Sequence, residues 1–317
     1  METKPILVLG ATGSFGGAIT RELLRRGRPV RAIARDLARA RSHFGGNGVD
    51  FVSGDVLDRD RLDEVARGCA AIVHAINVPY HQWDPTMIRA TENVIAAGRH
   101  VETVIFPGNV YGLGSQTGHP LDEETPNRPD SRKGRLRVTL EQRLQAATLG
   151  EEIRAVVVRA GDYFGPTVRH GLVDPIFGNA ARGKSIRYLG NGDALHQWVY
   201  VPDVASAAAD LLDIAASLEP FEIVNVGGYT DRQRAFLRTV ASVAGRPNLA
   251  VRRTPWSMLR LVALFNPVVR ELFELRYLFD DSVVLDDAKL RRLVPSFDYT
   301  PVEEAIRETL ESYRSGS

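Results

Sequence analysis

The chain has 317 residues, 44% of them hydrophobic and 25% charged, which is the composition of a globular protein with one large or two modest domains. The formal net charge of +1 predicts no general attraction to nucleic acid or to an anionic membrane, so neither is an expected partner. A single cysteine, Cys69, excludes an internal disulfide framework and favours a cytoplasmic location.

No signal peptide is expected, because the apolar run after Lys4 is short and is interrupted by glycines. The most membrane-like segment, 256–279, contains charged residues and a proline, and it therefore does not predict a spanning helix. A pair of amphipathic helices that covers a site or forms a subunit contact is the better interpretation.

The first structural signal is a short apolar run, 6–9, followed by Gly10, Gly13 and Gly16 and then by apolar residues at helical spacing. This pattern predicts a buried strand, a glycine turn and a helix. In a dinucleotide site such glycines allow a tight turn, the approach of a pyrophosphate and close packing of helix on strand, and the phosphates lie against unpaired N–H groups of the helix. The alternative is a strand-to-helix corner that needs small residues only for packing.

Strand and helix signals alternate through the first two hundred residues and predict a parallel sheet with helices on both faces. After the first strand we expect strands at 29–34, 50–53, 71–76, 101–106 and 153–158. The expected helices include 58–68, 84–98 and 134–149. The chain is expected to return to the sheet through 198–201, helix 203–216 and strand 222–226.

The predicted fold class is therefore α/β: a Rossmann-type, doubly wound parallel sheet with a smaller, mostly helical C-terminal substrate domain. Residues 1–165, completed by about 196–230, are expected to form the dinucleotide-binding domain. The segments 166–195 and 231–317 are expected to form the smaller substrate-binding portion, with one short strand near 282–285.

The end of the second strand predicts which dinucleotide is bound. An acidic residue there accepts the ribose 2′-hydroxyl, whereas an arginine suits a 2′-phosphate. Arg35 holds this position and Asp36 follows it, which favours NADP, with NAD left open. Asp55, after the third strand, is placed to accept a hydrogen bond from the adenine amino group, and its alternative role is to cap the next helix.

Taken together, several motifs resemble the short-chain dehydrogenase/reductase superfamily in its extended, epimerase/dehydratase form. The resemblance covers nearly the whole chain and rests on the glycine turn at 10–16, on 54–55, 72–77 and 110–112, and on 159–166, 198–204 and 225–228. It implies that the cofactor is touched by Gly10, Thr12, Gly13, Ser14, Phe15, Gly16, Arg35, Asp55, Val56, Ala75 and Asn77.

The chain departs from this family where proton transfer is expected. These enzymes typically use a serine near the fifth strand end and a Tyr-x-x-x-Lys motif on the next helix, where the lysine lowers the pKa of the tyrosine. No tyrosine lies between Tyr111 and Tyr163, and the family's pattern places Pro107, Lys133 and Arg137 at the serine, tyrosine and lysine positions. The chain therefore looks like an atypical subgroup that has lost the standard active site.

Other residues are candidates to replace the missing groups. Lys133 would hold a ribose hydroxyl or a phosphate, or serve as a general acid if desolvated; the alternative is a solvated lysine at a helix start. Pro107 and Arg137 join it as cofactor contacts, and Arg137 would hold the ribose or a carboxylate. Asn109 and Tyr111 are the further catalytic candidates, although Tyr111 suits packing as well. The expected substrate contacts are Tyr80, His81, Asp162, Tyr163 and His196.

Two functions remain open on the sequence. The first is an atypical NAD(P)-dependent oxidoreductase or epimerase-like enzyme that acts on a small organic substrate. The second is a catalytically silent NAD(P)-binding protein, either a redox sensor or a partner-binding scaffold. The seven histidines are scattered without ligand spacing, so no metal site is expected, and assembly as a homodimer is left open.

Overall fold

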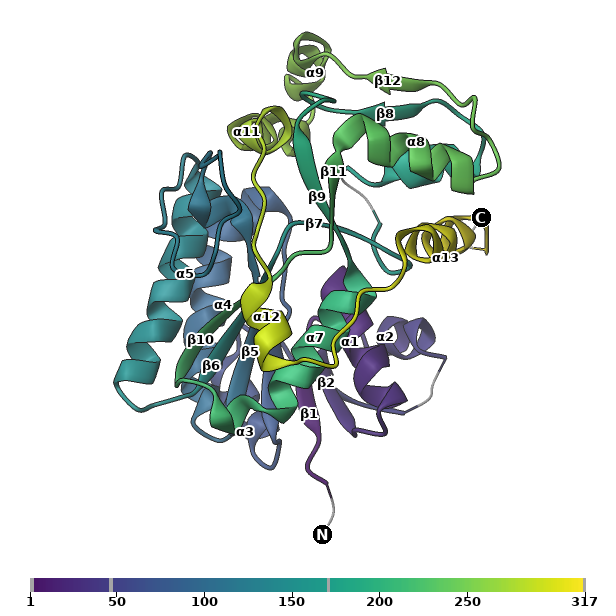
Figure 1. The fold of residues 1–317 in the computed structure, drawn as a ribbon. Coiled ribbons are helices and arrows are strands. Elements are labelled where there is room, and N and C mark those ends of the chain that lie inside the picture. Colours follow the sequence, from purple (N-terminus) through teal and green to yellow (C-terminus); the bar gives the residue numbers. More distant parts are fainter. Residues whose placement is uncertain (1–2, 46–47, 170–171, 316–317) are drawn as a thin grey trace.

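The computed structural model describes residues 3–45, 48–169 and 172–315, and its centre is a seven-stranded parallel sheet (Figure 1). The strand order is β10-β6-β5-β4-β1-β2-β3. The strands are β1 (Ile6–Leu9), β2 (Val30–Ala34), β3 (Val49–Ser53), β4 (Ala71–His74), β5 (Thr103–Asn109), β6 (Ala155–Ala160) and β10 (Phe221–Val226). This order reverses at β1, so the carboxyl ends of β1 and β4 border a crevice of the kind in which such sheets bind ligands.

Helices cover both faces of the sheet because its strands are apolar on both sides. In β1, Ile6 and Val8 face one core, together with α1 (Ser14–Arg25), α2 (Leu37–His43) and α7 (Val201–Asp213). Leu7 and Leu9 face the other core, together with α3 (Arg59–Ala66), α4 (Trp83–Gly98) and α5 (Arg132–Leu149). Alternate residues of a strand point to opposite faces, so each β1 side chain is buried.

The rest of the chain forms a smaller portion above the carboxyl ends of the strands (Figure 1). It contains a three-stranded sheet of β7 (Asp162–Phe164), β9 (Leu195–Tyr200) and β11 (Tyr229–Arg232), and a pair of β8 (Ile186–Tyr188) with β12 (Val251–Arg253). Its helices are α6 (Asn179–Ala181), α8 (Gln233–Val243), α9 (Trp256–Ala263), α10 (Pro267–Glu271) and α11 (Tyr277–Asp280), and α12 (Ala288–Leu293) and α13 (Val302–Ser315) follow. Short turns of helix include η1 (Tyr80–Gln82), η2 (Val110–Leu113), η3 (Asp174–Gly178), η4 (Ala215–Ser217) and η5 (Phe273–Leu275).

The predicted α/β fold class is confirmed, but two predicted strands lie elsewhere. The segment 198–201 was expected in the main sheet; it lies largely in β9, in the separate three-stranded sheet, and only β10 returns to the main sheet. The segment 282–285 forms a single bridge between Leu121 and Leu285 instead of a strand. The side chain of Gln197 supplies two hydrogen bonds of 3.1 Å to the backbone of Leu285, which replace part of a strand partner's pairing.

Segment 256–279, where a pair of amphipathic helices was expected, forms α9 and α10, followed by η5 and part of α11. Within the part of the chain that the structure describes, no helix has the length and apolar character needed to cross a membrane. α10 lies against η1, at one end of the cavity described below.

Candidate cofactor and active site

The turn between β1 and α1 has room for glycine alone at two positions. Gly10 has a φ of +80°, and a Cβ there would lie 2.6 Å from the carbonyl oxygen of Ala75. A Cβ on Gly16 would collide with the carbonyl oxygen of Gly10. Gly13 is the N-cap of α1, and no side chain caps the helix there. The uncapped amides at the start of α1 and the glycine floor beneath them therefore fit the diphosphate of a dinucleotide.

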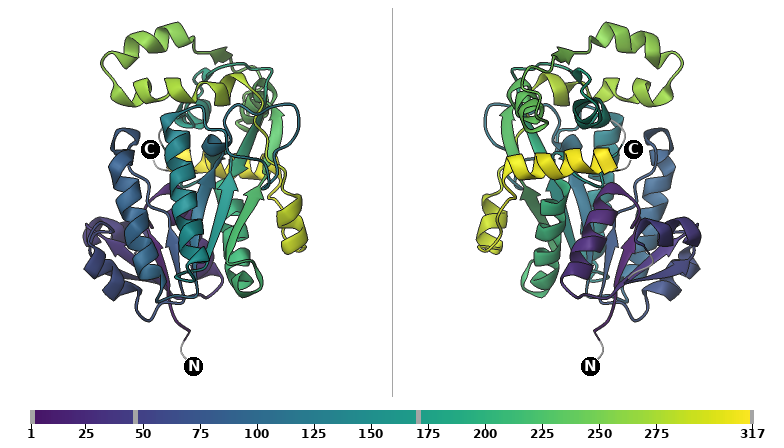
Figure 2. Two further views of the ribbon diagram at one scale, coloured as in Figure 1. Left: turned by 90° about the vertical axis from the view of Figure 1, so that its left-hand side faces the viewer. Right: turned by 90° about the vertical axis from the view of Figure 1, so that its right-hand side faces the viewer.

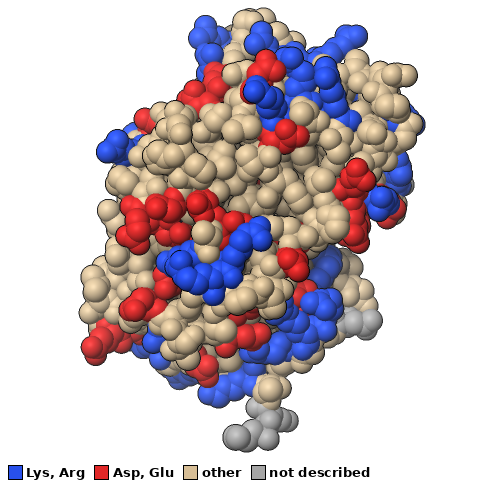
Figure 3. Space-filling view, in the orientation of Figure 1, with Lys and Arg blue, Asp and Glu red and all other residues tan. Residues whose placement is uncertain are grey.

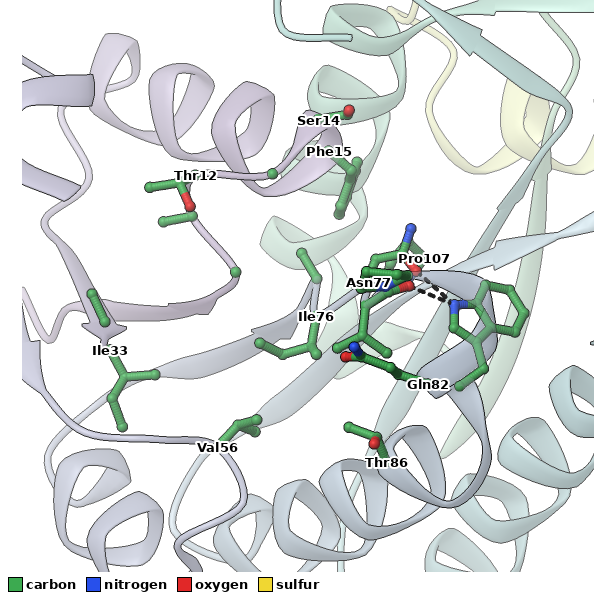
Figure 4. A pocket seen from close by; sticks show the side chains of 18 of the residues that line it. Thr12, Ser14, Phe15, Ile33, Val56, Ile76, Asn77, Gln82, Thr86 and Pro107 are labelled. Carbon is green, nitrogen blue, oxygen red and sulfur yellow. Dashed lines mark hydrogen bonds between the residues drawn. The ribbon is translucent and has the colours of Figure 1, made fainter. Parts of the chain in front are cut away.

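One cavity of about 850 Å³ extends from this turn along the carboxyl ends of the strands. Figure 4 shows Phe15 pointing from the start of α1 toward Asn77 and Pro107, with Ile33 and Val56 farther along the cavity. The cavity brings together most of the residues proposed from the sequence: Gly10, Thr12, Gly13, Ser14, Phe15, Arg35, Asp55, Val56, Ala75, Asn77, Tyr80, Pro107, Asn109, Tyr111, Arg137, Asp162 and Tyr163. It is not lined by Gly16, His81, Lys133 or His196.

The end of the cavity near β2 and β3 is polar and open. Arg35 is 83% exposed, and its guanidinium lies 3.9 Å from the carboxylate of Asp55. Asp36 also lines this end, and its carboxylate caps α2 by accepting from the N–H of Arg39 at 3.0 Å. The alternative role of Asp55 as a helix cap is wrong: Asp58 caps α3, whereas Asp55 accepts from the nearby N–H of Leu57 at 3.0 Å.

The opposite end of the cavity is aromatic and enclosed. The hydroxyls of Tyr80 and Tyr111 lie 3.0 Å apart and share a hydrogen bond. The indole N–H of Trp83 donates to Asn77 Oδ1 at 3.0 Å and to the carbonyl oxygen of Val78 at 2.9 Å, and so fixes the end of β4 (Figure 4). Burial raises the pKa of Tyr80, and it raises the pKa of Tyr111 well above its ordinary value, so both phenols are neutral at pH 7.

A third phenol, Tyr163, comes from β7 on the far side of this enclosed end. Its ring stacks on Phe15 with 6.5 Å between the ring centres. Its hydroxyl is buried and has no hydrogen-bond partner among the described residues, and burial raises its pKa to about 12. Asp162 lines the cavity and accepts from Nε2 of His196 at 2.9 Å, while His196 itself lies behind the wall against Trp198.

Arg137 lies beneath the end of β5. Its guanidinium packs over the ring of Phe106, 4.7 Å from the ring centre, and it donates to the carbonyl oxygen of Pro107. The side chain is only 6% exposed, its Nε has no partner among the described residues, and burial lowers its pKa. A buried guanidinium at a cavity wall is suited to hold an oxygen of a bound molecule.

The position of Lys133 differs from the sequence expectation and from its alternative. It is neither solvated nor on the cavity wall: its side chain is 4% exposed, and its ammonium donates to the carboxylates of Glu271 and Glu274. The two glutamates lie in α10 and η5, so Lys133 joins the start of α5 to the segment above it. The two glutamates are the acidic residues of segment 256–279, but nothing in the sequence pairs them with Lys133.

Comparison with known proteins shows to which family the chain belongs. Residues 6–227 match the model of the NAD dependent epimerase/dehydratase family. The chain belongs to this family. A dTDP-glucose 4,6-dehydratase of Mycobacterium tuberculosis is 24% identical over 84% of this chain and 78% of its own length. An uncharacterized protein of Sinorhizobium fredii is 28% identical over 71% of this chain. The chain spans only 56% of the length of that relative.

Solved structures of a dehydratase and an epimerase share the fold along nearly the whole chain. A dTDP-glucose 4,6-dehydratase from Bacillus anthracis in complex with NAD has a TM-score of 0.80 at 17% identity. The match covers 98% of this chain and 97% of the dehydratase. A UDP-glucose 4-epimerase from Brucella ovis in complex with NAD has a TM-score of 0.79 at 17% identity, with 98% of both chains covered. At these identities the likeness shows the fold alone. The family is one of NAD dependent epimerases and dehydratases.

Sequence reasoning about this epimerase/dehydratase family member missed several residues of the cavity wall. They include Trp83, Gln82 and Thr86. Trp83 and Thr86 lie in the first turn of α4, the first α-helix after the end of β4. Ligands of such sheets are bound at the strand ends, so this position was the available signal. In the described residues no cluster of three or more potential metal ligands is found.

Proposed function

We propose that the protein is an NADP-preferring oxidoreductase or epimerase-like enzyme of an atypical subgroup, acting on a small organic substrate. The observation that carries the proposal is the side-chain-free turn of Gly10 and Gly16 below the uncapped start of α1. The N–H groups of α1 would hold the diphosphate, and Asp55 would accept from the adenine amino group. Arg35 would pair with a 2′-phosphate, with Arg39 beside it on the same wall.

The chemistry belongs to the enclosed end of the cavity. When bound, the nicotinamide ring supplies a site that gives or accepts a hydride. Because burial keeps Tyr80 and Tyr111 neutral, the pair would donate a hydrogen bond to a substrate carbonyl oxygen and would not act as a base at pH 7. Tyr163 would contribute a second donor, and Arg137 would hold an anionic or hydroxyl oxygen. The curated relatives include enzymes of nucleotide sugars, and carbonyl or hydroxyl carbons of sugars suit this set of donors.

A second candidate function, cofactor binding without turnover, is favoured by one observation. Lys133, the residue at the family's tyrosine position, is held by Glu271 and Glu274 and does not reach the cavity wall. No lysine lines the cavity to lower the pKa of a tyrosine. Such a protein would bind the reduced and oxidised cofactor with different affinities and would report the redox state of the pool.

The cofactor is tested by calorimetric titration with NADPH and NADH. We expect tighter binding of NADPH, and Arg35→Ala should weaken NADPH binding about ten-fold, roughly the effect of one charge-assisted hydrogen bond, without a change for NADH. Arg41→Ala is the matched control, because Arg41 is an exposed arginine near this end that does not line the cavity. Equal affinity of the wild-type protein for NADPH and NADH would remove the role of Arg35.

Turnover is tested by single-turnover oxidation of bound NADPH against a panel of carbonyl compounds that includes nucleotide sugars with a keto group. Oxidation that is lost in Tyr111→Phe, with cofactor affinity unchanged, supports the enzyme and the donor role of the pair. If bound NADPH is still oxidised in Tyr111→Phe, the hydrogen-bond donor to the substrate is Tyr163 and not the pair. Binding of NADPH with no oxidation by any compound supports the silent alternative.

A further inference from the structure

An exposed apolar surface lies on α9 and on the turn that follows it. Seven large apolar side chains are exposed in the described part of the chain, and five of them lie within eight consecutive residues. Met258, Leu261, Val262 and Phe265 follow one another at the i, i+3, i+4, i+7 spacing of a single helical face, with Leu264 next to them. α9, the turn after it and α10 form a helical hairpin, and we call these five residues the hairpin tip. Phe265 is 89% exposed and Leu264 is 73% exposed.

The hairpin tip is not needed to fold the hairpin. The inner side of α9 is held by Trp256, whose ring lies 5.5 Å from that of Phe273 and 6.1 Å from that of Phe279. Figure 2 shows α9 and α10 as a helical pair at the top of the molecule that projects beyond the parts below it. Apolar side chains that face water at a projecting point, and that support no core, indicate a surface for contact with another body.

The charge around the hairpin tip identifies that body. Arg252, Arg253, Arg260 and Arg270 are all exposed in the segments that form and flank the hairpin. The acidic residues of the same segment, Glu271 and Glu274, turn inward and are paired with Lys133 and Arg132. Figure 3 shows arginine and lysine side chains around the upper end of the molecule, with an uncharged area and some acidic side chains between them. The outer side of the hairpin is thus apolar at its centre and positive at its margins.

We propose that the hairpin tip docks onto an anionic lipid surface, with Leu264 and Phe265 inserted at the level of the acyl chains and the four arginines at the headgroups. Apolar side chains combined with basic residues are the features by which helices lie in a membrane interface. The net charge of +1 argued against a membrane partner, but this sum includes acidic residues that lie far from the hairpin or face inward. The attachment is peripheral, and it is independent of the cofactor chemistry proposed above.

The proposal is tested by co-sedimentation of the full chain with vesicles of phosphatidylcholine, with and without phosphatidylserine. We expect binding to the vesicles that contain phosphatidylserine and release at high salt. The double variant Leu264→Ser/Phe265→Ser should weaken binding by at least about ten-fold, since it removes two apolar side chains from the interface. Arg260→Gln should weaken it about five-fold, which corresponds to one lost cation near an anionic surface.

Leu149→Ser is the matched control, because Leu149 is 81% exposed at the end of α5 and lies outside the hairpin tip. It should bind vesicles like the wild-type chain, and all variants should keep the cofactor affinity of the wild-type chain, which shows that they are folded. No sedimentation with phosphatidylserine, or equal sedimentation of the double variant, would overturn the proposal. It would also be overturned if the tip variant changed a dimer into a monomer in gel filtration without vesicle binding, because the occupant would then be a second copy of the chain.

Discussion

Gly10 and Gly16 exclude a side chain for different reasons, and this difference can be measured. At Gly10 both the positive φ and the carbonyl oxygen of Ala75 oppose a Cβ, whereas at Gly16 the obstacle is the carbonyl oxygen of Gly10 within the turn itself. In each case the neighbouring atom belongs to the backbone, which cannot move aside as the end of a flexible side chain can. The shape of the diphosphate site therefore depends on these two positions.

We predict that Gly10→Ala abolishes cofactor binding and lowers the free energy of unfolding by about 2–4 kcal/mol, through positive-φ strain of about 1–2 kcal/mol and steric overlap. Urea unfolding and calorimetric titration measure the two effects. Gly27→Ala is the control, since Gly27 has a φ of +69° but no atom within 4 Å of its Cβ position. Gly27→Ala should lose only the stability that corresponds to backbone strain, and it should bind the cofactor normally. Normal cofactor binding by Gly10→Ala would contradict the proposed diphosphate site.

Single residues also show where reasoning from the sequence ends. The glycine turn, Arg35 and Asp55 were placed correctly on one cavity because they follow strand ends, and parallel strands bring their carboxyl ends to one edge. The partner of Lys133 could not be derived in this way, since Glu271 lies 138 residues later and no local rule pairs the two. Likewise, the spacing of residues in the sequence does not indicate that the hydroxyls of Tyr80 and Tyr111 form a hydrogen bond.

At the level of elements, the start of α5 and the segment above it are joined by buried charge. Lys133 donates to Glu271 and Glu274, the N–H of Arg132 donates to Glu274 at 2.7 Å, and Tyr277 donates to the carbonyl oxygen of Tyr111 at 3.3 Å. The hydrogen bond from Lys133 lowers the pKa of Glu271. Removal of the lysine would leave two partly buried carboxylates without their main cation.

We predict that Lys133→Met lowers the free energy of unfolding at pH 7 by about 2–3 kcal/mol, since it breaks a largely buried ion pair. Glu271 has a lowered pKa in the folded state, so its pairing stabilises the fold above its ordinary pKa of 4.5 and is lost as the pH falls further. The gap between wild type and variant should therefore narrow below pH 4.5 in urea unfolding. A variant of unchanged stability that binds cofactor poorly would instead support the sequence-based role of Lys133 at the cofactor.

The element boundaries show a similar division between local and tertiary signals. Strand β1 was predicted to the residue because it is a short apolar run, and β2, β3 and β10 were predicted to within one residue at each end. β9 was assigned to the wrong sheet, since the order of strands depends on pairing with β7 and β11 and not on its own residues. The strand near 282–285 failed because Gln197 pairs with that backbone through its side chain.

Across the whole molecule the two portions share elements. The sheet is completed by β10, which follows β9 of the smaller portion, and α7 packs on α1 with an ion pair of 2.6 Å between Arg26 and Asp210. Asp203 at the start of α7 accepts from Thr300 Oγ1 at 2.7 Å, just before α13. The chain crosses between the portions more than once, so neither is expected to unfold alone.

We predict a single calorimetric unfolding transition that shifts as a whole when NADPH is added. At about 100 times its dissociation constant the ligand should add about 2.7 kcal/mol to the free energy of unfolding. The same titration with Gly10→Ala should leave the transition unmoved. Two transitions, of which only one responds to NADPH, would show that the sequence-based division at 165 separates independent units.

The cavity joins an exposed charged end at Arg35 to a buried aromatic end at Tyr111. Dissolved ions gather around the first end and screen its attraction for a phosphate, whereas they do not enter the second. Changes in ionic strength should thus tune how much cofactor the protein holds, while the polarity felt by the reacting atoms stays constant.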